Sequence, residues 1–166
     1  MKRIFAFTLA ISLSAGFLAA QTTPDPAVQA AKAKLEAVYD LGRVFGYIQA
    51  MDKDQKKLAV SVSQAKALVA IADKVLAAKR MEPKTAETWL VEIEDKILRA
   101  DQLMYVDGLA MDRETPATAG TGAGNTGGTS PVQSYMAGGP FNPMLDATKT
   151  LGKDFKAAYE YLKAKK

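Results

Sequence analysis

The sequence predicts a small all-α protein, and three observations support that prediction. Apolar residues recur at steps of three, four or seven along most of the chain, which is the period of amphipathic helices. Prolines stand where they suit the first turn of a helix, as at Pro26 and Pro83. The 166 residues have room for one domain, and 48% of them are apolar, which is enough for a buried core. We expect a small antiparallel helical bundle or hairpin.

Residues 1–20 have the pattern of a secretory signal peptide. Lys2 and Arg3 precede an uncharged apolar run that ends at Leu18, and a polar, proline-rich stretch follows Ala20. A retained membrane anchor is the alternative, but polar residues interrupt the run and no charged stop-transfer flank follows it. We therefore expect cleavage after Ala20 and a periplasmic or secreted protein without a stable membrane anchor.

A helical domain is predicted over residues 26–112, after a flexible lead at residues 21–25. Its first helix runs from Pro26 to about residue 51, and Gly42 and Gly46 lie on one face of it. Glycines one turn apart either let another helix approach closely or kink their own helix.

Two further helices follow in this domain. The second extends from Leu58 to about residue 80, and Leu68, Ile71 and Val75 widen its apolar stripe beyond a single seam. A stripe of that width needs neighbours on two sides, so these three residues are candidates for contact with a partner. The third helix opens at Pro83, and its apolar pattern changes phase near residues 99–101, which predicts a break there.

Residues 113–141 are predicted to be a disordered linker, and residues 142–166 a final amphipathic helix. The first part of the linker consists mostly of Gly, Thr, Ala and Pro, which bury little apolar area. The pair Asn142–Pro143 suits a helix start. We expect this helix to dock on the helical domain or on a partner, with Phe155 and Tyr159 as candidate partner-facing residues.

Ser61 and Gln64 have the spacing of a helix capping box. In such a box the serine hydroxyl accepts a hydrogen bond from the amide three residues on, and the glutamine side chain reaches back to the serine amide. The alternative is that the helix already runs through Leu58 and that Ser61 is an ordinary exposed residue.

A second segment, Leu98–Leu103, aligns with Val60–Ala65 and places Gln102 opposite the glutamine of the capping box. Both segments resemble the Leu-Thr-x-x-Gln motif that occurs twice in periplasmic Spy/CpxP-like proteins. The resemblance covers about residues 55–110. It implies a small, exported, all-helical chaperone or stress sensor that forms curved dimers. The copies depart from the motif: serine replaces threonine in the first, and Arg99, which has no side-chain acceptor, stands at the capping position of the second.

The composition excludes most kinds of catalytic and metal site. The chain has no His and no Cys, so it lacks the usual neutral-pH general base, thiolate nucleophiles, disulfides and the common zinc ligands. Asp52 and Asp54 begin like a calcium loop, but Lys57 and Ser63 occupy the positions that require Gly and Glu. We interpret that segment as a solvated turn, and we predict no catalytic residue, no cofactor and no metal ligand.

The charge balance gives no reason to expect a nucleic-acid partner. Residues 1–20 hold two of the 22 basic side chains and none of the 18 acidic ones, so the mature chain is close to neutral.

The function expected from these observations is that of an exported, non-enzymatic helical envelope protein. It is either a Spy/CpxP-like client-binding chaperone or stress protein, or a structural module that binds a dedicated protein partner or a second copy of itself.

The methionines of the chain either suit a promiscuous binding surface or simply fill gaps in the packing, and we favour gap filling. They include Met81, Met104, Met111, Met136 and Met144.

Overall fold

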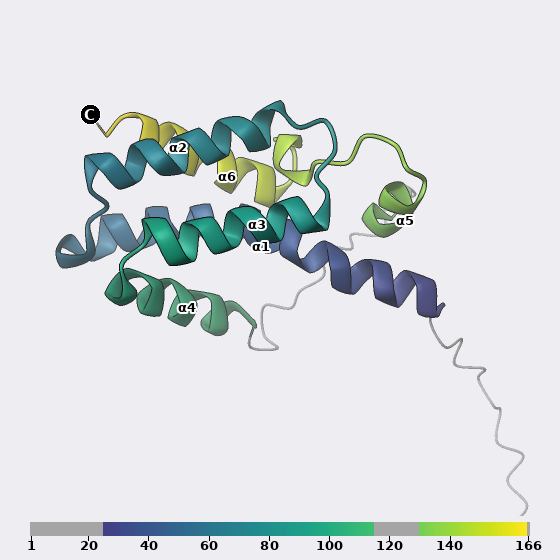
Figure 1. Ribbon diagram of the computed structural model, residues 1–166, viewed down its shortest axis with the longest axis horizontal. Coiled ribbons are helices and arrows are strands. Elements are labelled where there is room, and N and C mark those ends of the chain that lie inside the picture. Colours follow the sequence, from purple (N-terminus) through teal and green to yellow (C-terminus); the bar gives the residue numbers. More distant parts are fainter. Residues whose placement is uncertain (1–24, 115–129, 166) are drawn as a thin grey trace, which may run out of the picture.

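The computed structural model describes residues 25–114 and 130–165, and within these ranges the protein is all-α, as the sequence predicts (Figure 1). No strand occurs there, although one isolated bridge pairs Arg80 with Phe141. The predicted signal peptide with its cleavage site at Ala20 lies outside the described residues. The helices described are α1 (Pro26–Asp54), α2 (Val62–Ala77), α3 (Pro83–Glu92), α4 (Ala100–Glu114), α5 (Pro131–Met136) and α6 (Thr150–Lys163). Shorter elements are the 3₁₀ helices η1 (Lys56–Leu58) and η3 (Pro143–Leu145) and the π-helix η2 (Ile93–Ile97).

Helix α1 is the central element of the structure. Helices α3, α4, α5 and α6 pack against it, and α2 packs against α6 (Figure 1). The buried apolar side chains form one cluster that draws on all of these helices except α5. At its centre, the rings of Phe45 in α1 and Phe155 in α6 meet edge to face, with centroids 4.9 Å apart.

Helix α6 approaches α1 closely at two glycines. A Cβ atom at Gly42 would lie 2.8 Å from a methyl carbon of Leu151, and one at Gly46 would lie 3.9 Å from Cβ of Asp154. Of the two roles that the sequence allows for these glycines, close approach of another helix is therefore the one they have.

The helix boundaries differ in detail from those predicted. Helix α1 continues beyond its predicted end to Asp54. Helix α2 begins at Val62, because Ser61 is its N-cap and a separate 3₁₀ turn precedes it. The break expected near residues 99–101 lies at Leu98, where the π-helical turn ends in extended backbone.

The prediction of a disordered linker over residues 113–141 is wrong for residues 113–114, which belong to α4, and for residues 130–141. That part of the chain contains α5, which a capping box formed by Ser130 and Gln133 starts. Residues 115–129 of the expected linker lie outside the described residues.

Arg80, in the connection between α2 and α3, holds residues 130–141 in place. Its guanidinium donates hydrogen bonds to the backbone carbonyls of Tyr135 and Gly139 at 3.1 and 2.6 Å, and it lies 4.3 Å from the centre of the Tyr135 ring. Phe141 is buried in the core, and its ring meets that of Tyr135 edge to face. A few directed contacts of this kind order a glycine-rich segment that composition alone classes as flexible.

Helix α6 begins at Thr150, not at Asn142 as the sequence predicts. The Asn142 side chain donates to the carbonyl oxygens of Val75 and Ala78 at the end of α2, both at 2.7 Å. The N-cap pattern at Asn142 therefore opens only the 3₁₀ turn η3. The same side chain also caps the C-terminal end of α2, far earlier in the chain.

Candidate functional site

The two aligned glutamine segments start two helices, α2 and α4. At α2 the structure contains the capping box: Ser61 Oγ accepts from the Gln64 amide at 3.2 Å, and Gln64 Oε1 accepts from the Ser61 amide at 2.9 Å. At α4, Gln102 Oε1 accepts from the Arg99 amide at 2.9 Å. Because Arg99 offers no acceptor, the carboxylate of Asp101 accepts from the Gln102 amide instead, at 3.0 Å.

The two glutamines also bind each other, a contact that the sequence alignment does not predict. Gln64 Nε2 donates to Gln102 Oε1 and to the Ile97 carbonyl, both at 2.7 Å. Gln102 Nε2 donates to the Leu58 carbonyl at 2.9 Å. Each glutamine side chain therefore reaches the backbone that precedes the other helix. Gln102 is fully buried. This arrangement joins α2 to α4 and leaves no side-chain polar group of Gln102 for an outside ligand.

The residues predicted to face a partner lie inside the protein. Leu68, Ile71, Val75 and Phe155 are each at most 1% exposed, so that prediction is wrong for them. Tyr159 is half-buried, and its hydroxyl donates to Asp73 at 2.8 Å. The wide stripe of α2 meets α6, η2 and η3, all from the same chain.

Asp52 is not part of a solvated turn, contrary to the sequence interpretation. It lies in the last turns of α1, and its buried carboxylate accepts hydrogen bonds from the Val60 amide at 2.5 Å, from Lys165 Nζ at 2.7 Å and from the Tyr161 hydroxyl. Burial alone would raise the pKa of Asp52, but the bonds from Lys165 and Tyr161 bring it below its ordinary value. The bond to Asp52, followed by burial, raises the pKa of Tyr161 to about 12.

The outer face of α4 carries the two most exposed large apolar side chains of the described residues. Met104 is 73% exposed and Met111 is 70% exposed. Gly108 lies between them along the helix, and no packed side chain or other segment comes within 4 Å of the place where its Cβ would be. Two shallow, open hollows adjoin these residues. We call this surface, made by Met104, Gly108 and Met111 with the two hollows, the α4 outer face.

Acidic side chains surround the α4 outer face. The hollows are lined by Asp101, Asp107 and Asp112, and no basic residue lines them. Burial, followed by the charge of Asp107 and of two further aspartates, raises the pKa of Glu94 on the neighbouring η2. The charged residues that line the two hollows are therefore all acidic, and one of them, Asp101, is paired with Arg99.

The methionines divide between buried and exposed positions. Met81 and Met144 are buried and fill the core. Met104 and Met111, together with Met136 on α5, are exposed. The spacing of Met104 and Met111, which places them on one side of a helix, was the available signal for a surface. The sequence could not show which side of α4 would pack on α1.

Other kinds of site find no support in the part of the chain that the structure describes. There, no group of three or more acidic side chains is placed to hold a metal ion, and every buried side-chain polar atom has a hydrogen-bond partner. None of the described helices combines the length and the apolar character needed to cross a bilayer.

No protein-family model, curated protein or solved structure matches this chain significantly. The function therefore has to be inferred from the chain's own residues and contacts.

Proposed function

We propose that this chain is an exported, non-enzymatic helical protein that binds an apolar segment of another protein along the α4 outer face. The observation that carries the proposal is the exposure of Met104 and Met111 on either side of Gly108. Exposed apolar surface costs solvation free energy unless something covers it, and a contiguous exposed apolar patch marks an interaction site.

The chemistry of the face favours a partner with varied apolar side chains. Methionine is flexible and polarizable, so a methionine surface repacks around different shapes. Helix α4 packs chiefly on α1, which leaves its outer side available for a partner (Figure 1). The missing Cβ at Gly108 lets a partner backbone or side chain come close to the helix between the two methionines.

The charges around the face favour a partner segment that is basic as well as apolar. Asp107 lines one hollow, and Asp112 and the Arg99-paired Asp101 line the other, so a lysine or arginine bound near Asp107 would gain favourable Coulomb energy. A second copy of this chain, docked α4 to α4, would bring these aspartates toward one another. We therefore favour a different protein as the partner over self-association.

Two forms of this function differ in their partner. A client-binding chaperone, as the resemblance to Spy/CpxP-like proteins implies, would bind many unfolded chains, whereas an interaction module would bind one dedicated protein. The described core is closed and presents no apolar cradle, which favours the interaction module. The exposed methionines favour the chaperone.

A labelled amphipathic peptide of leucine and lysine tests the proposal by fluorescence anisotropy. The double variant Met104→Ser/Met111→Ser should bind it at least about tenfold more weakly than the unmodified protein, because the apolar contacts are lost. The matched control Val91→Ser/Met136→Ser changes two exposed apolar residues elsewhere, which are 51% and 49% exposed, and should bind within about twofold of the unmodified protein.

Two further measurements separate the possible outcomes. A peptide with glutamate in place of lysine should bind more weakly, because of the aspartates on the hollows. Delayed aggregation of a denatured client at equimolar ratio supports the chaperone form, and peptide binding without that delay supports the interaction module. If the leucine–lysine peptide does not bind, or binds both double variants equally, the proposal is wrong.

A further inference from the structure

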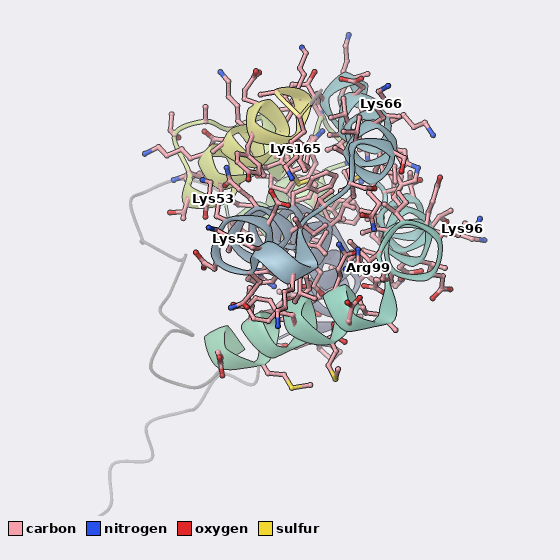
Figure 2. The ribbon with its side chains drawn as sticks, turned by 90° about the vertical axis from the view of Figure 1, so that its left-hand side faces the viewer. Lys53, Lys56, Lys66, Lys96, Arg99 and Lys165 are labelled. Carbon is pink, nitrogen blue, oxygen red and sulfur yellow. The ribbon has the colours of Figure 1, made fainter. Side chains whose placement is uncertain are left out.

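One end of the molecule gathers basic side chains from several elements. Helices α1 and α6 end there, and α2 and α4 begin there. Figure 2, which looks at this end, shows the labelled cations spread around it from one edge to the other. We call this surface the basic end, and its residues are Lys53, Lys56, Lys66, Lys96, Arg99 and Lys165.

Most of the positive charge at the basic end is not neutralised. Lys56, Lys66 and Lys96 are exposed, and none of them forms an ion pair within the described residues. Only two of the six cations pair with acids at this end, Lys165 with the buried Asp52 and Arg99 with Asp101. The exposed carboxylates close by in the sequence, Asp54 and Asp95, are fewer than the free lysines.

The same end also presents a small apolar tip. Ala59 is exposed, and Val62, in the first turn of α2, is 43% exposed. Lys66 lies one helical turn after Val62, and Lys56 lies in the 3₁₀ turn just before Ala59. The tip therefore has lysines on both sides of it along the chain.

This combination distinguishes between two polyanionic partners. A nucleic acid is held by cations that follow its backbone and by aromatic rings on which bases stack. An exposed valine among lysines adds nothing to phosphate binding. A bilayer surface uses both features, because lysines contact lipid phosphates while a small apolar group enters the boundary between headgroups and acyl chains.

We propose that the basic end docks on the surface of a bilayer that contains anionic phospholipids. Lys56, Lys66 and Lys96 contact the phosphates, and Val62 enters the interfacial layer. The attachment is peripheral and reversible, and it weakens with salt because exposed charges are screened over about 8 Å at physiological ionic strength. Helix α4 runs along one edge of this end, so the α4 outer face stays accessible when the basic end is docked (Figure 2).

Co-sedimentation with vesicles tests the inference. The chain from Gln21 onward is used, since every core residue lies between Leu35 and Leu162 and the apolar run before Gln21 would itself enter membranes. In low salt this protein should sediment with vesicles of phosphatidylglycerol and phosphatidylcholine, and it should stay in solution with phosphatidylcholine alone. Raising the salt to about 0.5 M should release it, because the screening length then falls to a few ångströms.

Charge-reversal variants locate the contact. Lys56→Glu/Lys66→Glu/Lys96→Glu should lower the partition onto anionic vesicles by at least about tenfold. The matched control Lys32→Glu/Lys34→Glu/Lys84→Glu changes net charge equally at exposed positions near the starts of α1 and α3, and it should bind within about threefold of the unmodified protein. Circular dichroism of both triple variants should give the helical spectrum of the unmodified protein, which serves as the folding control.

Three results would overturn the inference. Equal loss of binding in the two triple variants would mean that net charge, and not the basic end, attracts the protein. Equal sedimentation with both vesicle types would mean that anionic lipid is not recognised. Binding of a DNA oligonucleotide with no vesicle binding would identify a nucleic acid as the polyanion.

Discussion

At the scale of single residues, Gln102 is a polar side chain that is fully buried in the helical core. Its side-chain oxygen accepts from two donors, and its amide group donates to backbone carbonyls before α2. A buried amide that loses such partners costs more free energy than an exposed one, because water cannot replace them.

Replacing Gln102 with alanine should lower the free energy of unfolding by about 2–4 kcal/mol, through lost hydrogen bonds and the cavity left behind. Gln133→Ala is the matched control, because the Gln133 side chain likewise accepts from the amide three residues earlier but is exposed. It should cost about 1 kcal/mol or less. Urea denaturation followed by circular dichroism measures both values, and equal losses would contradict the structural role assigned to Gln102.

Residue patterns in the sequence predict the capping box but not the contact between the two glutamines. The capping box at Ser61 depends on residues three apart, so local spacing is enough to predict it. The contact between Gln64 and Gln102 depends on how two helices are placed, and no local pattern encodes it. For the same reason Leu68 and Ile71 are recognisable as apolar, but the sequence does not show that this chain's own helices cover them.

At the scale of elements, the start of α6 shows how a local turn delays the beginning of a helix. The Asp146 carboxylate accepts from the backbone amide and the hydroxyl of Thr148, which closes a turn before the helix. Gly152 then passes so close to this turn that a Cβ atom would lie 2.2 Å from the Asp146 carbonyl oxygen. The opposing atom is backbone, so it cannot move aside as a side chain can.

Gly152→Ala should therefore destabilise the protein by about 1–3 kcal/mol, since the turn or the helix must shift. Gly108→Ala should instead stabilise it by about 0.5–1 kcal/mol, because Gly108 is within α4 with open space at its Cβ position. Thermal or urea unfolding of the two variants reports the sign of each change. A stabilising Gly152→Ala would show that the close approach to Asp146 is not maintained in solution.

At the scale of the whole molecule, the Asp52 network joins three distant parts of the chain. It contains the end of α1, the backbone before α2 and the end of α6. Amphipathic periods predict each helix separately, because they depend on neighbours three and four residues away. Such periods cannot predict that Lys165 and Asp52 meet.

This network should make the free energy of unfolding fall both at low pH and at high pH. Because the folded-state pKa of Asp52 is lowered, its contribution is present above about pH 4 and is lost as the pH falls through the folded-state value. Because the pKa of Tyr161 is raised to about 12, its contribution is complete below pH 10 and is lost as the pH rises toward 12.

Urea denaturation at pH 8 and at about pH 11.5 measures the alkaline loss. The Tyr161→Phe variant should lose less stability than the unmodified protein between these pH values, because it has no hydroxyl to ionise beside Asp52. Some loss should remain, since burial also raises the pKa values of Tyr39 and Tyr135. Parallel losses in the two proteins would show that Tyr161 does not contribute to the alkaline dependence.

The bond between Gln64 and Gln102 couples local unfolding at the start of α2 to local unfolding at the start of α4. Each of them completes the first turn of one helix while it holds the backbone that leads into the other, so neither turn can fray alone without disturbing its counterpart. In deuterated solvent, the Ser61 and Arg99 amide protons should then exchange as one cooperative opening, although they are far apart in the chain.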